Sequence, residues 1–466
     1  MADEHDLVVI GGGPGGYAAA LYGAAAGLSV ALVERAEVGG TCLHRGCIPA
    51  KQLLETATVY RTVARAGDFG VVADPPSVDL PAAQARKREV VGQLHRGLGG
   101  LLKKRGVEVV AGTGTLGPDR TVTVASEDGS RRQLVGRHVV LATGSLPRTL
   151  DGFEVDGTTV LTSDEVLELQ CLPASAAVIG GGAIGCEFAS LLGDLGTDVT
   201  VLEALPQLLA GVDGDVAEVV ARSFQRRGIT VHTGVAVHGH DPADAKTTVR
   251  FGRGESVTVE AVIMAVGRRP LAETLGLEGT AVQLDDRGFV AVDEYLRTGE
   301  EGVYALGDLV ATPQLAHVGF AEAIVAVRHM LGEAVAPVEY DKVPWCIYSH
   351  PEVAFAGLTE SAAREAGHDV VVTCHRFNAN SRALVVGEPE GLVKVVAERE
   401  AGGRVGRLLG VHLVGPWVTE QLAEGYLAIN WEATPEDIGP LVHPHPTLSE
   451  TFGETVLALT GRGLHA

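Results

Sequence analysis

The residues with the clearest chemistry are two cysteines, Cys42 and Cys47, in the segment GGTCLHRGCIPAK that spans residues 39–51. Cysteines this close together can form a disulfide, and Pro49 suits the first turn of a helix. A helix that begins there would lower the pKa of the Cys47 thiol through its dipole and nearby cations. The segment therefore predicts thiol chemistry.

Two other interpretations of this pair are open: a pair of buried structural thiols, and half of a zinc site. A zinc site needs two more ligands at short spacing. The remaining cysteines are far apart in sequence: Cys171, Cys186, Cys346 and Cys374. We therefore expect no metal site, and six cysteines in 466 residues do not indicate a disulfide scaffold.

A second candidate group lies near the C-terminus, in the segment HPHPTLSE at residues 443–450. A histidine can take a proton from an attacking thiol at neutral pH. The alternative is structural, because Thr447-x-x-Glu450 is also a capping box and a histidine before proline is often a surface residue. We interpret His445 as the base, oriented by Glu450, which would take the proton from a thiol that attacks Cys42.

The elements that would position these groups include one unit that occurs twice. Strands at 6–10 and 175–179 each run into a Gly-x-Gly-x-x-Gly turn, a helix, and a second strand, at 29–33 and 198–202, that leads into an acid. The acid follows the first glycine by 23 residues in both copies. The six fingerprint glycines are Gly11, Gly13, Gly16, Gly180, Gly182 and Gly185, and the two acids are Glu34 and Glu203.

This duplicated pattern is typical of dinucleotide binding. The glycines make the turn, let backbone N–H groups approach a pyrophosphate and pack helix on strand, while the acid accepts hydrogen bonds from a ribose diol. The alternative is two glycine turns that merely connect strands. Glu203 would repel a 2′-phosphate, and no arginine follows it before Arg222, so the second unit favours NAD over NADP.

The chain length predicts several domains. Further apolar strands end at glycine turns near residues 144 and 267, as expected of strands that close two nucleotide-binding units. After about Asp341 the sequence changes to segments of alternating hydropathy, such as 391–396 and 408–414. We expect an α/β fold with two Rossmann-like domains and a C-terminal α+β dimerisation domain. The predicted divisions are 1–148 (first nucleotide), 149–270 (second nucleotide), 271–341 (central, returning to the first) and 342–466 (interface).

Composition excludes some function classes. The formal charge of −22 and the pI near 5.1 disfavour nucleic acid and anionic membranes as partners. The apolar run at 17–33 is interrupted at residues 27–29, so we interpret it as a buried helix and strand rather than a membrane span. The acidic N-terminus is unlike a secretory or transit signal, which predicts a cytoplasmic protein.

Together these motifs resemble the FAD-dependent pyridine nucleotide-disulfide oxidoreductases over essentially the whole chain, and most closely the members that oxidise dihydrolipoamide. Many members have Asn-Val where this chain has His44-Arg45, and Ala where it has Pro444. These departures bear on redox tuning more than on reaction class. The further segments that carry the resemblance are 142–145 (ATGS), 265–270 (AVGRRP), 306–308 (LGD), 315–317 (LAH), 343–348 (VPWCIY), 351–354 (PEVA) and 443–450.

The resemblance implies a role for each matching residue. Cys42 would exchange with substrate, Cys47 would face the flavin, and Lys51 and Glu187 would pair beside the flavin ring. Residues implied to hold FAD are Gly11, Gly13, Gly16, Glu34, Lys51, Gly114, Thr143, Gly144, Asp308 and Ala316. Those implied to hold NAD are Gly180, Gly182, Gly185, Glu187, Glu203, Val235 and Gly267.

The activity implied is oxidation of protein-bound dihydrolipoamide to lipoamide with reduction of NAD to NADH. The implied partners are a second copy of the chain, whose His445 acts across the dimer, and a lipoyl domain of a 2-oxoacid dehydrogenase acyltransferase or a glycine cleavage carrier protein. One alternative is a related reductase of mycothiol, glutathione or mercuric ion, although the terminal cysteine pair usual in mercuric reductases is missing. A more distant alternative is a non-catalytic FAD-binding redox regulator.

Overall fold

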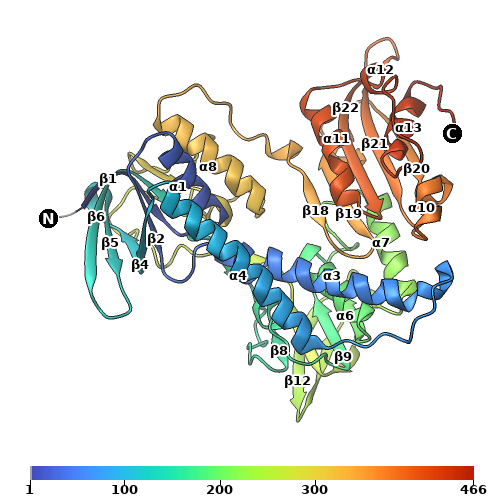
Figure 1. Cartoon of the computed structure of the whole chain (residues 1–466), viewed down its shortest axis with the longest axis horizontal. Helices are drawn as coiled ribbons and strands as arrows, with labels where there is room; N and C mark the ends of the chain where they lie inside the picture. Colours follow the sequence, from blue (N-terminus) through green and yellow to red (C-terminus); the bar gives the residue numbers. More distant parts are fainter. Residues whose placement is uncertain (1–2, 466) are drawn as a thin grey trace.

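The computed structural model describes residues 3–465 and has a mixed α/β architecture of three parts (Figure 1). One part is built on a mixed, mainly parallel sheet, one on a parallel sheet and the third on an antiparallel sheet. The predicted fold class is therefore confirmed. The apolar run at 17–33 falls in a helix and a strand, and no helix within residues 3–465 has the length and apolar character needed to cross a bilayer.

The first nucleotide-binding unit is a seven-stranded sheet in the order β3-β2-β1-β6-β5-β4, with β17 paired to β6. The apolar residues 7–10 of β1 are fully enclosed between neighbours because both faces of the sheet are covered. The strands are β1 (Asp3–Ile10), β2 (Val30–Glu34), β3 (Glu108–Ala111), β4 (Thr113–Leu116), β5 (Thr121–Ala125), β6 (Arg131–Leu141) and β17 (Val303–Ala305).

Helices α1 (Pro14–Ala25) and α8 (Ala316–Met330) lie side by side against this sheet (Figure 1). The redox segment forms the short helix α2 (Gly40–His44) and the start of α3 (Cys47–Ala64), which packs on α4 (Leu80–Lys104). Short 3-10 turns η1 (Ala66–Phe69) and η2 (Pro118–Arg120) complete the unit. The start of α1 thus lies at the carboxyl edge of the sheet, where ligands of such folds bind.

The second unit repeats this plan in a five-stranded parallel sheet, β11-β10-β9-β15-β8. An antiparallel three-stranded sheet and the small β7–β16 ladder accompany it. Its elements are β7 (Ser145–Pro147), β8 (Val160–Leu161), α5 (Ser163–Val166), β9 (Ser175–Ile179), α6 (Ala183–Asp194), β10 (Asp198–Leu202), α7 (Gly214–Arg226), β11 (Thr230–His232), β12 (Val237–Ala243), β13 (Lys246–Phe251), β14 (Glu255–Val259), β15 (Ala261–Met264) and β16 (Arg268–Pro270).

After β16 the chain returns to the first unit through β17, the 3-10 turn η3 (Gly307–Leu309) and α8, and then crosses by η4 (Tyr340–Lys342) to the third part. This part is an antiparallel sheet in the order β18-β19-β22-β21-β20. Its elements are β18 (Trp345–Ile347), β19 (Glu352–Gly357), α9 (Glu360–Glu365), β20 (Val370–Arg376), η5 (Phe377–Ala379), α10 (Ser381–Val385), β21 (Leu392–Arg399), β22 (Val405–Gly415), α11 (Val418–Asn430), α12 (Pro435–Ile438) and α13 (Glu450–Leu459). The exact division of the chain at 148, 270 and 341 stays a prediction.

Candidate active site

A cavity of about 1050 Å³ joins both nucleotide-binding units and the redox segment. Its walls come from the carboxyl ends of both parallel sheets, from α2 and α3, and from the start of α8. Most of the predicted site residues line it: Gly11, Gly13, Glu34, Cys42, Cys47, Lys51, Gly114, Thr143, Gly144, Gly180, Gly182, Glu187, Glu203, Val235, Gly267, Asp308 and Ala316.

The two fingerprint turns have backbone conformations that favour glycine. Gly11 and Gly180 have φ values of 107° and 105°, and a Cβ there would lie 2.2 and 2.3 Å from a backbone oxygen. Gly16 and Gly185 do not line the cavity. A Cβ on either would lie only 1.8 or 1.9 Å from the carbonyl oxygen of the first glycine, so they allow the helix to pack on the turn.

The middle glycines, Gly13 and Gly182, face open space, because no atom lies within 4 Å of a Cβ built on either. They are the N-cap residues of α1 and α6, and no side chain caps these helix ends. The first-turn N–H groups are therefore free to donate to a phosphate. Each glycine turn and the helix start after it form a cradle of backbone N–H groups, and the two cradles, at Gly13 and Gly182, fit the pyrophosphates of two dinucleotides.

The predicted ribose-binding acids are oriented identically in the two units. Glu34 accepts hydrogen bonds from the N–H groups of Gly12 and Ala36 at 2.6 and 2.8 Å. Glu203 accepts them from Gly181 and Leu205 at 2.5 and 2.7 Å. Backbone donors thus hold each carboxylate beside its glycine turn, where a ribose diol would reach it.

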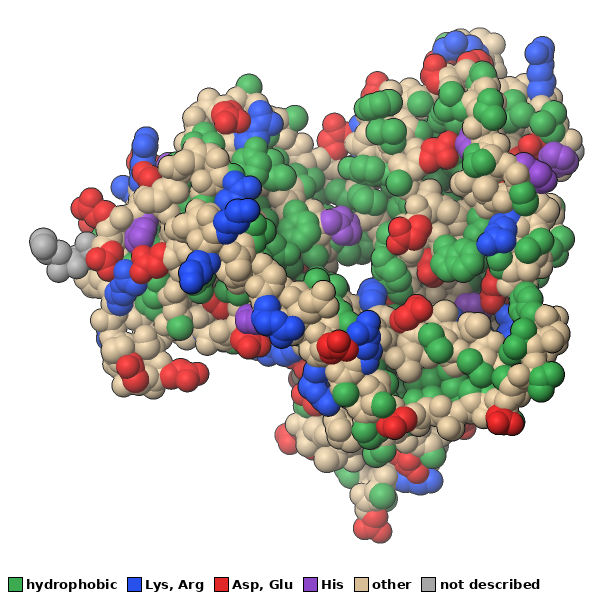
Figure 2. Space-filling model, viewed as in Figure 1, with side chains coloured by type: hydrophobic (Ala, Val, Ile, Leu, Met, Phe, Trp, Pro, Cys, Tyr) green, Lys and Arg blue, Asp and Glu red, His purple; other side chains and the backbone are tan. Residues whose placement is uncertain are grey.

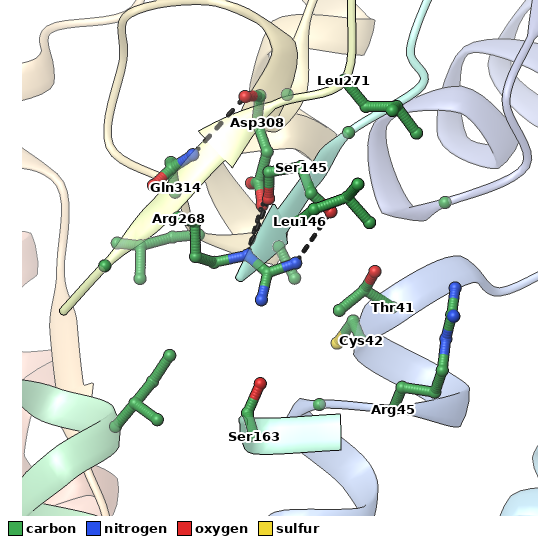
Figure 3. Close-up of a pocket in the computed structure, with 18 of the residues that line it drawn as sticks. Thr41, Cys42, Arg45, Ser145, Leu146, Ser163, Arg268, Leu271, Asp308 and Gln314 are labelled. Carbon is green, nitrogen blue, oxygen red and sulfur yellow. Dashed lines mark hydrogen bonds and ion pairs between the residues drawn. The ribbon is translucent and has the colours of Figure 1, made fainter. Parts of the chain in front are cut away.

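Two residues at this site were not among the sequence-based candidates. Ser145 donates a hydrogen bond from Oγ to Asp308 at 2.5 Å, and Arg268 donates to the same Oγ at 2.7 Å and to the Ser145 carbonyl at 2.8 Å (Figure 3). Arg268 lies 3.7 Å from the Asp308 carboxylate. Both belong to segments that carry the family resemblance, so the motifs contained the signal, but their mutual contact depends on the pairing of β7 with β16.

The two thiols lie on consecutive helices, α2 and α3. Cys42 lies in α2, Cys47 is the first residue of α3, and both are free thiols. The hydrogen bond between them, together with burial, raises the pKa of Cys42. The same hydrogen bond and the Lys51 cation lower the pKa of Cys47 against the opposing effect of burial. This asymmetry makes Cys47 the more acidic thiol of the pair.

Lys51 and Glu187 bring α3 and α6 together at the cavity. The Lys51 ammonium lies 2.9 and 2.8 Å from the two carboxylate oxygens of Glu187, which also accepts the N–H of Tyr348 at 2.9 Å. Burial opposes the charge on Lys51, but Glu187 and Cys47 outweigh it and raise the pKa of Lys51. The pair thus places a permanent cation beside the Cys47 thiolate.

His445 and Glu450 lie outside this cavity, on the antiparallel part of the chain. The imidazole Nδ1 is 2.8 Å from Oε2 of Glu450, and the His445 side chain is 72% exposed. Glu450 is the first residue of α13, and its N–H donates to Thr447 Oγ1 at 3.2 Å. The carboxylate thus orients an exposed imidazole and does not close a capping box, but one chain alone does not bring His445 to Cys42.

The comparisons with known proteins cover the whole chain. Residues 5–323 match the family model described as pyridine nucleotide-disulphide oxidoreductase, and residues 343–456 match the dimerisation domain of that family. A dihydrolipoyl dehydrogenase of Bacillus subtilis (strain 168) is 42% identical, and one of Zymomonas mobilis is 40% identical, each with 100% of both chains covered. The crystal structure of LpdA from Mycobacterium tuberculosis superposes with a TM-score of 0.91 at 27% identity, over 98% of this chain and 100% of that one. The flavoprotein disulfide reductase RclA from Escherichia coli has a TM-score of 0.86 at 26% identity, over 97% and 99%.

Proposed function

Since this chain belongs to the pyridine nucleotide-disulphide oxidoreductases, we propose that it oxidises the dihydrolipoyl group of a carrier protein and reduces NAD. The observation that carries the proposal is the polarised thiol pair beside Lys51 and Glu187, in one cavity with two dinucleotide cradles. Full-length relatives at about 40% identity that are dihydrolipoyl dehydrogenases support this choice of substrate.

The family uses FAD and NAD, so both predicted cofactors are confirmed. The proposed FAD site is the cradle at Gly13, with Glu34 at the ribose and Asp308 and Ala316 across the cavity. The proposed NAD site is the cradle at Gly182, with Glu203 at the ribose. When bound, FAD supplies the two-electron carrier between the thiol pair and the nicotinamide of NAD.

Each protein group has a defined task in the proposed reaction. His445 of the partner subunit takes a proton from one substrate thiol, and the resulting thiolate attacks the sulfur of Cys42 in the oxidised pair. The Cys42–Cys47 bond breaks and Cys47 leaves as a thiolate, stabilised by the start of α3 and by Lys51. The second substrate thiol then displaces Cys42, which releases lipoamide and leaves both cysteines reduced.

The transfer of a proton from the substrate thiol to His445 of the partner subunit requires a dimer. The match of residues 343–456 to the dimerisation domain supports the predicted homodimer. Hydrophobic side chains gather around the hollow between the first nucleotide-binding unit and the antiparallel part (Figure 2). Exposed apolar residues on the flanking helices α8 and α11 include Ile324, Tyr426 and Leu427. We propose that this hollow receives the partner subunit and the lipoyl arm, whose carrier would be an acyltransferase lipoyl domain or a glycine cleavage carrier protein.

A substrate panel tests the proposed function. NAD reduction should be measured with dihydrolipoamide, glutathione and mycothiol, and NADH-dependent turnover with mercuric ion. We expect kcat/KM for dihydrolipoamide to exceed the others by at least about tenfold, which is roughly 1.4 kcal/mol of transition-state preference. Equal or better turnover of another substrate would overturn dihydrolipoamide as the substrate, and no turnover of any would favour a redox regulator.

A further inference from the structure

A buried carboxylate behind the cavity has no role in the thiol chemistry. Glu322 lies in α8 and is 0% exposed, and its side chain forms no ion pair with a lysine, arginine or histidine of residues 3–465. An ionised carboxylate in such a place is costly unless hydrogen bonds replace its water. The bonds that Glu322 makes therefore indicate what it does.

Three donors surround the Glu322 carboxylate. Oε2 accepts the backbone N–H of Gly307 at 2.6 Å, and Oε1 accepts the hydroxyls of Thr312 at 2.7 Å and Tyr340 at 3.0 Å. Gly307 and Thr312 both lie in the segment 306–315, which connects β17 to α8. Glu322 therefore bonds this segment at two points, five residues apart.

The same segment carries residues that line the cavity. Asp308 follows Gly307 directly, and the chain continues to Ala316 at the start of α8. Asp308 is held from the opposite side by Ser145, as Figure 3 shows. The segment is thus fixed through its backbone by Glu322 and through its Asp308 side chain by the other nucleotide-binding unit.

This arrangement reduces stability at neutral and higher pH. Burial, with a smaller effect from the neighbouring Asp308, raises the pKa of Glu322 from 4.5 to about 7, although its three donors oppose the shift. A carboxyl group whose pKa is raised on folding contributes stability below its unfolded pKa of 4.5, and loses that contribution as the pH rises through about 7. An uncharged side chain would not carry this cost, and the three donors around the carboxylate indicate that the ionised form has a role.

We propose that Glu322 is a positioning residue for FAD, and that its ionised form locks the 307–312 segment in the shape that holds the cofactor. The Gly307 N–H can only donate, so it bonds Glu322 in either protonation state. A proton on Oε1 would force the hydroxyl of Thr312 or Tyr340 to turn from donor to acceptor. Protonation would also turn the hydrogen bonds from Gly307 and Thr312 to a charged carboxylate into weaker neutral ones, and would so loosen the segment.

The groups that face Glu322 are few. From η3 it faces Asp308, whose charge opposes ionisation, and from η4 it faces Tyr340, whose own pKa is raised by burial and by Glu322. Thr312 does not titrate. A change in cofactor retention near pH 7 should therefore originate at Glu322 itself. The inference depends on FAD use and is independent of the thiol substrate.

The test is the rate of FAD release from the holoenzyme, without thiol substrate, measured by the recovery of flavin fluorescence from pH 6 to 8.5. In the unmodified enzyme, release should slow by about fivefold as the pH rises through 7, the effect expected of one hydrogen bond. In Glu322→Gln, release should be fast at every pH. Amide hydrogen exchange across residues 306–313 should also be faster in this variant.

Glu352→Gln is the matched control. Glu352 is another carboxyl group whose burial raises its pKa and which accepts hydrogen bonds from a threonine, but it lies on β19. It should keep the pH-dependent step. The thermal midpoint of Glu322→Gln at pH 8 should equal or exceed that of the unmodified protein, which would separate faster release from unfolding.

The proposal is overturned if Glu322→Gln keeps the step near pH 7, or if exchange in residues 306–313 is unchanged. Should that variant fail to fold, Thr312→Val and Tyr340→Phe each remove one donor to Oε1 and should each speed release above pH 7. Unchanged release in both would equally refute the role of Glu322. Because no thiol is present, these results are independent of the substrate panel.

Discussion

The pairing of Lys51 with Glu187 predicts a measurable loss of stability on Lys51→Met. The Glu187 side chain is 8% exposed and that of Lys51 33% exposed. Removal of one partner from a fully buried pair costs about 3–5 kcal/mol. Because Lys51 is one-third exposed and Glu187 keeps the Tyr348 N–H, we expect about 2–3 kcal/mol here, which lowers the thermal midpoint of a chain of this size by about 2–3 °C.

The same substitution should alter the thiol chemistry. Lys51 is one of the groups that lower the pKa of Cys47, so its loss should raise that pKa. The assay is the pH dependence of alkylation of the dithionite-reduced enzyme by iodoacetamide, with modification of Cys47 followed by mass spectrometry. The alkylation profile of Cys47 should move to higher pH in Lys51→Met.

Two further variants make the reasoning refutable. In Lys51→Met/Glu187→Gln the unpaired carboxylate is removed, so the double variant should lose less stability than the sum of the single variants. Lys246→Met breaks an exposed pair with Glu260, 4.0 Å apart, and should change stability by no more than about 0.5 kcal/mol. Additive losses in the double variant, or an unmoved Cys47 profile, would show that the pair does not act as the geometry indicates.

The remaining predictions concern the thiol pair, the cofactor and the dimer. Cys42→Ser and Cys47→Ser should both abolish thiol-dependent turnover, but only reduced Cys42→Ser should show a long-wavelength absorbance from a thiolate next to the flavin; the same spectrum in both would contradict the assigned roles. Glu203→Ala should shift the preference between NADH and NADPH toward NADPH by about 1–3 kcal/mol, read from the ratio of kcat/KM values, and an unchanged ratio would remove Glu203 as the discriminator. Heterodimers of Cys42→Ser and His445→Gln subunits should recover part of the activity that each homodimer lacks, whereas no recovery after confirmed exchange of subunits would place the site within one chain.

The duplicated units could be predicted from sequence because their signals are local. The strands expected at 175–179 and 198–202 have these bounds in the structure, since a glycine or an acid at a turn ends each one. β1 begins at Asp3, three residues before the expected strand, where its polar residues pair with β6 at the exposed end of the sheet. Buried apolar residues identify a strand in the sequence, whereas exposed polar residues that pair only at the end of a sheet do not.

The C-terminal sheet was predicted less completely. The segments expected at 391–396 and 408–414 are strands of residues 392–399 and 405–415. Their additional residues form the turn end of a hairpin, where register shifts interrupt the pairing and the polar pattern no longer alternates. The order of strands in this sheet depends on contacts between distant segments, which no local pattern contains.

The contacts that sequence reasoning did not find join residues far apart in the chain. Arg268 and Ser145 are 123 positions apart. The Lys51–Glu187 pair, 136 positions apart, was expected from the resemblance to the family and not from any local pattern. In the sequence, Glu322 is a single carboxylate within the otherwise apolar stretch 318–327. Only the return of the chain through β17 places Gly307 against it. Motifs therefore predicted candidate site residues, whereas their contacts depend on how distant segments pack together in the fold.

This dependence on docking extends to the thiol pair itself. Cys47 gains part of its stabilisation from the start of α3, which is local, and part from Lys51. Lys51 in turn is held as a cation by Glu187, which the second nucleotide-binding unit supplies from α6. A thiolate formed before the two units dock would lack this support, so we infer that the chain completes its redox centre only when both nucleotide-binding units are in place.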